Sequence, residues 1–364
     1  QGDLNPDKNI ASCVKHFAAY GAPEGGREYN TVDMSERRLR EDYLPAYKAA
    51  VDSGCELVMT SFNTVDGIPA SGNKWLMRDV LREEWGFNGV IISDYAAIQE
   101  LIAHGVAEDD REAAKLGIEA GVDIDMKTPV YSNQLEGLVK DGVISEELID
   151  EAVWRILNLK NKLGLFENPY RGANIDKEKE VILSPEKRKL ARKISGESIV
   201  LLENNGVLPL SKDKKVALIG PYGESRVLSG SWAINSNPKD VTPLMDAIKE
   251  KISEENFTYA KGCEMIEDKS ILGGFGRAVE EEKIEFDPQK DIDEAIEAAK
   301  KSDVVIMALG EHPLQSGEGG SRTELSIEKI QLELLKKVRA LGKPVVLVIF
   351  NGRPLVLTNV VEKV

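Results

Sequence analysis

The stretch Gly89-Val90-Ile91-Ile92-Ser93-Asp94-Tyr95 decides the fold class of the first half of the chain. It is a short apolar run that ends in a carboxylate, which is how a parallel α/β sheet presents a charged group at its active edge. The stretch Ala11-Ser12-Cys13-Val14-Lys15-His16-Phe17 repeats the pattern and ends on a cation and an imidazole. Taken singly, each polar residue could equally be an ordinary cap of the next helix. Three at successive strand ends favour a shared site.

The sequence around these two runs alternates strands with helices. We predict strands near 10–16, 55–62, 89–94 and 122–126, each followed by helical sequence. Such alternation specifies a parallel sheet. In the helix after Asp33, that residue and Glu36 resemble a capping box, and Gly54 ends the helix. One face of this helix carries the apolar residues Leu39, Tyr43, Tyr47 and Val51, and a second amphipathic helix is predicted from Ser145 to Lys162.

A second domain is predicted after a linker at residues 164–184. Ser184 followed by Pro185 is a strong helix start. Continuous apolar runs at 216–220, 304–310 and 345–350 alternate with helical sequence and predict an open parallel sheet. The expected fold class is therefore α/β, with part of a (β/α)8 TIM-type barrel in residues 1–163 and an open, incomplete α/β sandwich in residues 185–364.

Composition restricts the partners of this chain. Its 364 residues carry 47 basic and 62 acidic side chains, a net charge of −15 that argues against nucleic acid and anionic membrane surfaces. No apolar run reaches the length of about 18 residues that a membrane span needs. Cys13, Cys55 and Cys263 are too few and too widely spaced for a disulfide framework or a zinc site, and we expect the first two to be small core residues.

A second carboxylate is available in the glycine-rich segment 310–322, which contains Glu311 and Glu318 and directly follows a predicted strand. Without a site in the first domain, a solvated surface loop would be the better interpretation. Together with Asp94, however, it supplies the two carboxylates of glycoside hydrolysis, a reaction that needs no cofactor and no metal. Lys15 and His16 would bind sugar hydroxyls, and Trp75, Trp232 or Phe62 could stack on a ring. The segment 220–225 lacks the spacing of a phosphate loop.

The chain resembles glycoside hydrolase family 3, and within it the bacterial β-glucosidases of the periplasmic type. The segments that carry the resemblance are Lys15-His16-Phe17-Ala18-Ala19-Tyr20-Gly21, Glu24-Gly25-Gly26-Arg27-Glu28-Tyr29-Asn30, Met59-Thr60-Ser61-Phe62-Asn63, Trp85-Gly86-Phe87-Asn88-Gly89, Ser93-Asp94-Tyr95 and Gly164-Leu165-Phe166. They occur in the family's order over essentially the whole chain.

The resemblance implies a retaining β-glycosidase that removes terminal β-D-glucosyl residues from oligosaccharides or from aryl and alkyl glucosides. It implies that Asp94 is the nucleophile and that Glu318, before Gly319-Gly320-Ser321-Arg322, is the acid/base, with Glu311 as the fallback. The implied substrate-binding residues are Lys15, His16, Arg27, Met59, Tyr95 and Trp232. Phe62 stands where relatives often have tyrosine. The N-acetylglucosaminidase branch uses a histidine shortly after the Lys-His-Phe motif, and Ala18-Ala19-Tyr20-Gly21 contains none.

Alternatives remain open at this point: a β-xylosidase of the same family, a non-catalytic sugar-binding fragment, and a Schiff-base aldolase that uses Lys15. A closed barrel needs eight strands in about 250 residues, and four units precede the linker, so the resemblance predicts a fragment that lacks the first half of the barrel. We expect such a chain to be aggregation-prone and nearly inactive on its own. A homo-oligomer is compatible with the sequence, which does not decide between a periplasmic or extracellular and a cytoplasmic location.

Overall fold

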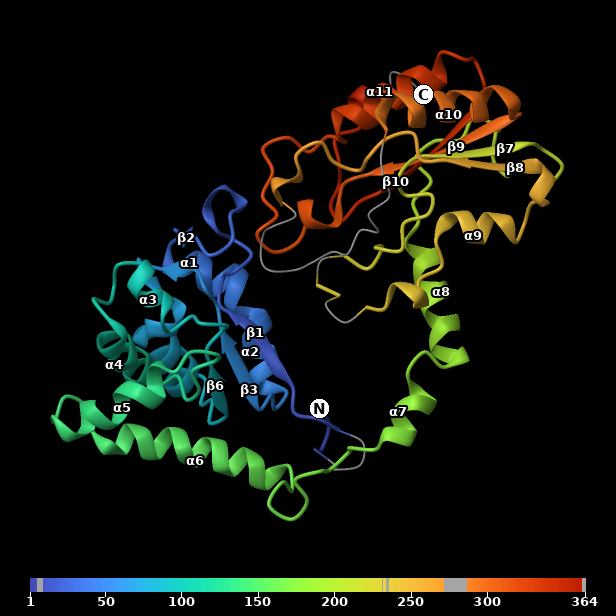
Figure 1. The fold of residues 1–364 in the computed structure, drawn as a ribbon. Helices are drawn as coiled ribbons and strands as arrows, with labels where there is room; N and C mark the ends of the chain where they lie inside the picture. The colour runs from blue at the N-terminus through green and yellow to red at the C-terminus, as the bar shows by residue number, and fades with distance from the viewer. Residues whose placement is uncertain (5–8, 231, 234–235, 272–286, 362–364) are drawn as a thin grey trace. The chain divides into compact units, whose positions relative to one another are not determined.

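The structure is a computed structural model that describes residues 1–4, 9–230, 232–233, 236–271 and 287–361. The chain divides into two compact units, Gln1–Ile194 and Ser195–Val364. Figure 1 shows both units with their elements labelled. Each unit is described by itself below.

A parallel sheet organises the first unit. Its strands are β1 (Cys13–Phe17), β3 (Leu57–Thr60) and β6 (Val90–Ile92), in the order β1-β3-β6. Leu57 pairs with Cys13 on one side and with Val90 on the other, so the three strands start level and end at one edge. The predicted strands near 10–16, 55–62 and 89–94 are confirmed, with shorter bounds.

The fourth predicted strand, 122–126, is reduced to a single parallel bridge between Ile92 and Ile124. Asp123 gives the physical reason. Its Oδ2 accepts the backbone N–H of Ile91 at 2.8 Å, where a strand would offer a carbonyl oxygen. The same carboxylate binds Arg82 at 2.7 Å and Arg155 at 2.9 Å. A buried ion cluster thus replaces part of the ladder, and the prediction of a regular fourth strand was wrong.

The first helix of the unit runs without a break through α1 (Glu36–Arg38), the turn Leu39–Tyr43 and α2 (Leu44–Asp52). Its cap is Ser35, whose hydroxyl accepts the Arg38 N–H, so the predicted cap at Asp33 was wrong by two residues. The helix ends before Gly54, at φ 85°, as predicted. Its predicted apolar face is confirmed: Leu39 is buried, and Tyr43, Tyr47 and Val51 pack against the core.

Further helices cover the strands of the first unit. They are the segment Trp75–Glu84, α3 (Glu100–Ala103), α4 (Asp110–Ala120), α5 (Val130–Lys140) and α6 (Glu146–Lys162). Ser145 caps α6 by accepting the Glu147 N–H, which confirms the predicted second amphipathic helix. A small second sheet of β2 (Thr31–Val32), β4 (Thr64–Val65) and β5 (Ile68–Pro69) lies in the loops that follow β1 and β3.

Residues 164–184 are not featureless, because they contain α7 (Ile175–Val181). The predicted helix start at Pro185 is confirmed as α8 (Pro185–Ser198), with the Ser184 hydroxyl 3.5 Å from the Lys187 nitrogen. The apolar side chains of Ile175, Leu190 and Ile194 are all exposed on these two helices.

The second unit is an open parallel sheet in the order β10-β9-β7-β8. Its strands are β7 (Val216–Ile219), β8 (Phe257–Ala260), β9 (Val304–Gly310) and β10 (Val345–Phe350). The strand β8 was not predicted, since Phe257-Thr258-Tyr259-Ala260 is no continuous apolar run. Helices α10 (Pro288–Lys301) and α11 (Lys329–Arg339) cover one face and α9 (Leu244–Lys249) the other, as Figure 1 shows, while α12 (Thr358–Val361) follows β10.

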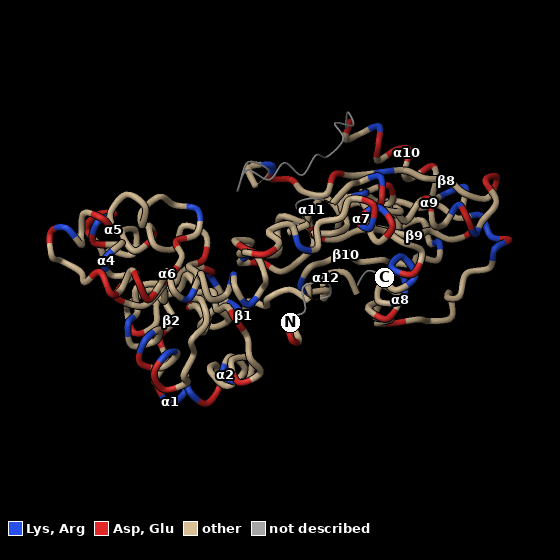
Figure 2. Tube along the Cα trace, turned by 90° about the horizontal axis from the view of Figure 1, so that it is seen from below, with Lys and Arg blue, Asp and Glu red and all other residues tan. Residues whose placement is uncertain are grey.

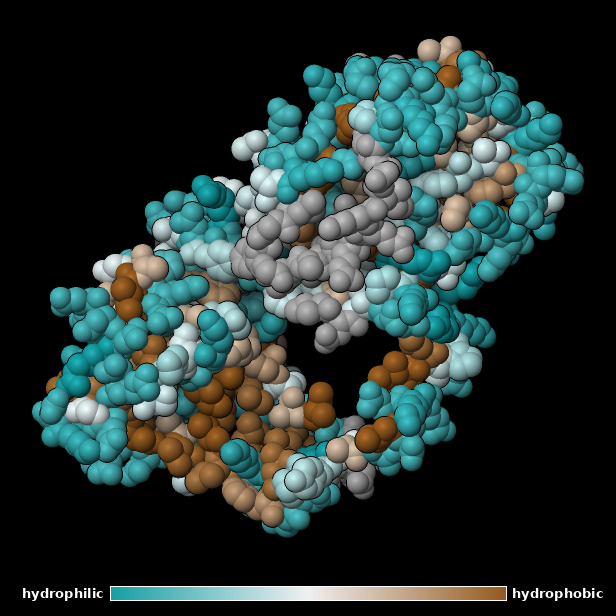
Figure 3. All heavy atoms as spheres, in the orientation of Figure 1, coloured by the Kyte–Doolittle hydropathy of each residue, from teal (hydrophilic) through white to brown (hydrophobic). Residues whose placement is uncertain are grey.

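The surface carries both signs of charge along the two units (Figure 2). Apolar side chains also reach the surface, and in Figure 3 they gather on the first unit beside the strands and α6. In the part of the chain that the structure describes, no helix combines the length and apolar character that crossing a membrane requires. Cys13 is exposed and Cys55 half-buried, because both lie where a strand begins rather than in its middle, so their prediction as core residues was wrong.

Candidate active site

Asp94 lies just beyond the carboxyl end of β6, and only 8% of its surface is exposed. Its Oδ1 accepts the backbone N–H of Tyr95 at 2.7 Å, and its own N–H donates to the Thr60 hydroxyl at 3.2 Å. Its Oδ2 is buried and has no hydrogen-bond partner among the described residues. Buried polar atoms without a hydrogen-bond partner are uncommon in folded proteins, so this oxygen stands out among the described residues.

His16, near the end of β1, is the ionisable neighbour of that oxygen. Its Nε2 lies 3.4 Å from Oδ2 of Asp94. The backbone of His16 is held by Tyr47 on α2, whose phenol donates to the His16 carbonyl oxygen at 2.6 Å. The peptide bonds Lys15–His16 and Phe17–Ala18 on either side are both cis. Of the three residues predicted to lie together at one edge of the sheet, His16 and Asp94 are thus in contact, and Lys15 is the third.

The other predicted residues of the first unit are Lys15, Arg27, Met59 and Tyr95, and the last of them donates its backbone N–H to Asp94. Lys15 and Arg27 are exposed, and among the described residues neither forms an ion pair with Asp94. Met59 is half-buried and pairs with Ile92 in the sheet. The Tyr95 ring is 57% exposed and lies 5.0 Å below the Lys127 ammonium group.

The rings of Tyr20, Phe62 and Tyr29 form a chain of contacts that begins at His16. The His16 and Tyr20 rings meet edge to face at 5.3 Å, Tyr20 contacts Phe62 at 5.9 Å, and Phe62 contacts Tyr29 at 5.0 Å. Tyr29 has a φ of 67°, a backbone conformation that side chains other than glycine seldom adopt. Phe62 is itself buried, so it supports this chain of contacts as a packed residue rather than as an open stacking surface.

Two carboxylates of the second unit follow β9 and differ sharply in environment. Glu311 is 2% exposed, and its carboxylate receives the Gly352 N–H at 2.9 Å and lies 3.3 Å from Arg322 and 3.7 Å from Arg353. Glu318 is half-exposed in the glycine-rich tip of the same loop. Glu311 thus anchors the loop, whereas Glu318 is only partly buried.

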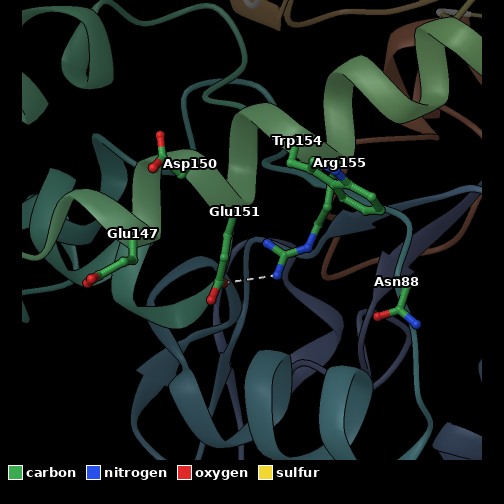
Figure 4. A pocket seen from close by; sticks show the side chains of 6 residues that line it. All are labelled: Asn88, Glu147, Asp150, Glu151, Trp154 and Arg155. Atoms are coloured by element: carbon green, nitrogen blue, oxygen red, sulfur yellow. Dashed lines mark hydrogen bonds and ion pairs between the residues drawn. The ribbon is translucent and has the colours of Figure 1, made fainter.

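A pocket of the first unit lies away from this chemistry. It is lined by Asn88, Glu147, Asp150, Glu151, Trp154 and Arg155, with Glu151 and Arg155 paired at 3.0 Å (Figure 4). Asn88 precedes β6 whereas Asp94 follows it, so about 20 Å of extended chain separates them. The pocket is therefore at the opposite end of the strands from Asp94.

Comparisons with known proteins identify the family of the chain. The family model described as the glycosyl hydrolase family 3 N-terminal domain matches residues 4–159, and the model of the family's C-terminal domain matches residues 199–364. The chain belongs to glycosyl hydrolase family 3. Within the family, the first match supplies the TIM-type domain and the second the α/β domain, so the predicted fold class is confirmed.

Relatives within family 3 carry two activities in their names. The chain is 42% identical to a periplasmic beta-glucosidase of Salmonella typhimurium over 99% of its length and 48% of that protein. It is 36% identical to a beta-xylosidase of Formosa agariphila, of which it covers 50%. A crystal structure of a beta-glucosidase from Listeria innocua in complex with isofagomine matches with a TM-score of 0.87 at 45% identity, over 100% of this chain and 48% of that one. The chain thus spans about half the length of these family members.

Sequence reasoning missed the residues that hold the site together. Thr60 and Ser71 lie behind Asp94, and Tyr47 lies behind His16. Thr60 stands inside the family segment that begins at Met59, but nothing in its residue type distinguishes it from a core threonine. Among the described residues, no group of three or more His, Cys, Asp or Glu side chains could hold a metal ion.

Proposed function

We propose that the protein carrying this chain is a retaining β-glycosidase in which Asp94 is the nucleophile. The observation that supports this most is the carboxylate itself: it is buried at the end of a parallel strand, and its Oδ2 is without a hydrogen bond among the described residues while Oδ1 is fixed. Attack by Oδ2 on the anomeric carbon forms a glycosyl ester, which water then opens. His16, beside Oδ2, is placed to bind a sugar hydroxyl next to the reacting carbon.

We infer that Glu318 protonates the departing oxygen and then activates the water. Its half-exposed position at a glycine-rich tip suits a group that must contact substrate, whereas Glu311 is enclosed by two guanidinium groups. Trp232, which is 56% exposed, is proposed as a further sugar contact in the second unit.

A β-D-glucoside is the substrate that we favour. The relatives with 42% and 45% identity are named beta-glucosidases, and solved structures of the Listeria innocua protein contain glucose and laminaribiose. The β-xylosidase alternative is supported by the 36% identical relative. A panel of nitrophenyl glycosides assayed on the full-length protein decides between them: the higher kcat/KM on the glucoside supports our proposal, and the higher value on the xyloside replaces it.

Trapping tests the role of Asp94. A 2-deoxy-2-fluoroglucoside with a good leaving group should accumulate as an ester on Asp94, because fluorine destabilises the oxocarbenium-like transition states of both steps. Peptide mapping of the full-length protein then locates the label. A label on another residue, or a product with inverted anomeric configuration, contradicts the assignment.

The Schiff-base aldolase has less support. An imine-forming lysine is desolvated or lies beside another cation, whereas Lys15 is exposed. Borohydride treatment in the presence of a carbonyl substrate should leave Lys15 unmodified. A stable adduct on Lys15 would overturn the hydrolase proposal.

A further inference from the structure

Two hydroxyl groups lie directly behind Asp94. Thr60 is the last residue of β3, and Ser71 belongs to the short helical turn Ala70–Gly72 that follows β5. Their oxygens are 2.7 Å apart, and the two residues are 0% and 1% exposed. The Thr60 hydroxyl also accepts the N–H of Asp94 at 3.2 Å. Asp94 lies beyond the end of β6 at Ile92, so its N–H does not bond to a carbonyl oxygen of the neighbouring strand. The Thr60 hydroxyl accepts this N–H instead.

The remaining polar groups around the Asp94 backbone are fixed as well. The Ser93 hydroxyl donates to the Asp94 carbonyl oxygen at 2.9 Å and accepts the Met126 N–H at 2.8 Å. The Tyr95 N–H donates to Oδ1 at 2.7 Å. The N–H, the C=O and one carboxylate oxygen of Asp94 therefore each have a partner. Only Oδ2, the oxygen beside His16, is left for substrate.

We propose that Thr60 and Ser71 form a positioning pair that sets the location of the Asp94 carboxylate. The inference rests on the proposed function, since it takes Asp94 as the nucleophile. Neither hydroxyl touches substrate, and both act through the Asp94 backbone. Ser71 is itself held from the side of the small sheet, where the Ala70 N–H donates to the Asn63 carbonyl oxygen at 3.1 Å. The β4–β5 hairpin thereby supports the nucleophile from behind.

Loss of the Thr60 hydroxyl should displace the nucleophile rather than merely loosen the core. Valine has nearly the shape of threonine but leaves the Asp94 N–H buried without an acceptor. The backbone of Asp94 must then shift to find a new partner, and its carboxylate shifts with it. A displacement of about 1 Å in a reacting group can cost on the order of 100-fold in rate.

The test compares four variants of the full-length protein: Thr60→Val, Thr60→Ser, Ser71→Ala and the control Thr64→Val. Thr64 is a buried threonine on β4 whose hydroxyl has no hydrogen-bond partner among the described residues, so its loss removes no positioning contact. Each variant is reacted with a 2-deoxy-2-fluoroglucoside at saturation, and the rate of ester formation is recorded. Inhibition by glucose and the melting temperature are measured alongside.

We expect Thr60→Val to slow ester formation by on the order of 10- to 100-fold and Ser71→Ala by less, with glucose inhibition unchanged. Thr60→Ser should restore most of the rate, and Thr64→Val should trap as fast as wild type. If Thr60→Val does not fold, the Ser71→Ala variant decides the question. Slower ester formation in folded Ser71→Ala than in wild type supports the positioning pair, and an unchanged rate overturns it.

Two other results overturn the inference. In the first, Thr60→Val melts at a lower temperature but forms the ester at the wild-type rate, which shows that the hydroxyl pair is purely structural. The other is a Thr60→Ser variant as slow as Thr60→Val, which removes the role of the hydroxyl. Failure of the proposed function is a distinguishable result, since the wild-type protein itself would then carry no label on Asp94, and it overturns both.

Discussion

The Nε2 atom of His16 lies 3.4 Å from Oδ2 of Asp94, although the two residues are far apart in the sequence. The contact exists because β1 and β6 flank β3 in one parallel sheet and end at the same edge. Tyr47 fixes the backbone of His16 from the helix side. The imidazole is therefore held against the carboxylate oxygen that we propose to be reactive.

Replacing His16 should weaken sugar binding and catalysis together. We expect His16→Phe to lower kcat/KM by on the order of 2- to 10-fold, since one hydrogen bond contributes about 0.5 to 1.5 kcal/mol. His104→Phe is the matched control, because His104 is also half-buried but ends α3 instead of β1. Steady-state kinetics with nitrophenyl glucoside measures both. Equal losses in the two variants would remove the special role of His16.

Replacing Glu318 should separate substrates by their leaving groups. Glu318→Ala should lose far more activity on alkyl glucosides than on dinitrophenyl glucoside, because a good leaving group departs without a proton. Added azide should restore turnover and yield a β-glucosyl azide. If the losses on the two substrates are equal, the acid/base assignment passes to Glu311.

The buried cluster around Asp123 should matter for stability. Burial lowers the pKa of Arg82 to about 10, so its guanidinium stays charged at neutral pH and needs the Asp123 carboxylate. Asp123→Asn should cost about 3 to 5 kcal/mol in the free energy of unfolding. Asp141→Asn, which breaks the exposed pair with Arg111 at 2.7 Å, should cost about 0 to 1 kcal/mol. Urea unfolding measures both costs, and similar values would contradict the expectation that the buried ion pair matters more for stability than the exposed one.

Cys263 should be inert to alkylation in the folded protein. Its side chain is fully buried, and burial raises its pKa to about 12, so the reactive thiolate is scarce. Since the folded state keeps a proton that the unfolded thiol loses near pH 9, this residue favours folding below pH 9 and loses that contribution as the pH rises toward 12. Iodoacetamide labelling at pH 8 should reach Cys263 only in denaturant. Labelling at the same rate in native protein would show that the core is open.

Exposed apolar side chains of α6 should promote self-association of the 364-residue chain expressed alone. Trp154 and Leu157 are 62% and 45% exposed on this helix. Contiguous apolar surface of this kind drives association. We expect Trp154→Lys with Leu157→Lys to shift size-exclusion profiles toward monomer, whereas the control Lys160→Glu, an already charged position, should not. Soluble monomeric wild-type chain that hydrolyses nitrophenyl glucoside at about 10 per second would contradict the expected aggregation and inactivity.

The sequence predicted those parts of the fold that depend on local pattern. Short apolar runs predicted the strand that contains His16 and the strand that precedes Asp94, and the cap and the apolar period predicted the helix after Ser145. The strand β8 was missed because its residues alternate in character. A full strand was predicted at 122–126, where the structure has a single bridge at Ile124. The apolar pattern does not show that the Asp123 side chain will replace a backbone hydrogen-bond partner.

The candidate site was predicted unevenly for a similar reason. Asp94 and His16 are ionisable residues that follow or end apolar runs, a pattern that a sequence displays directly. The proposed role of Thr60 and Ser71 depends on geometry, because it rests on a 2.7 Å contact between the end of a strand and a short helical turn, which their residue types do not reveal. Glu311 illustrates the reverse case: its charge made it a candidate, and only its two arginine neighbours show that it is an anchor.

The contacts of Glu311 and Arg353 divide the loop after β9 into a base that is held by hydrogen bonds and a tip of residues 316–319. Arg353 binds the carbonyl oxygens of Gln315 and Gly320, and Glu311 itself is bonded to Gly352, so the base closes on both sides of residues 316–319. Lengthening a loop whose ends are already held costs little, about 0.6 kcal/mol for each doubling. Insertions between Ser316 and Gly319 can therefore change the reach of Glu318 while the sheet beneath keeps its sequence. Protein engineering can therefore treat the tip that carries the proposed acid/base as an exchangeable part.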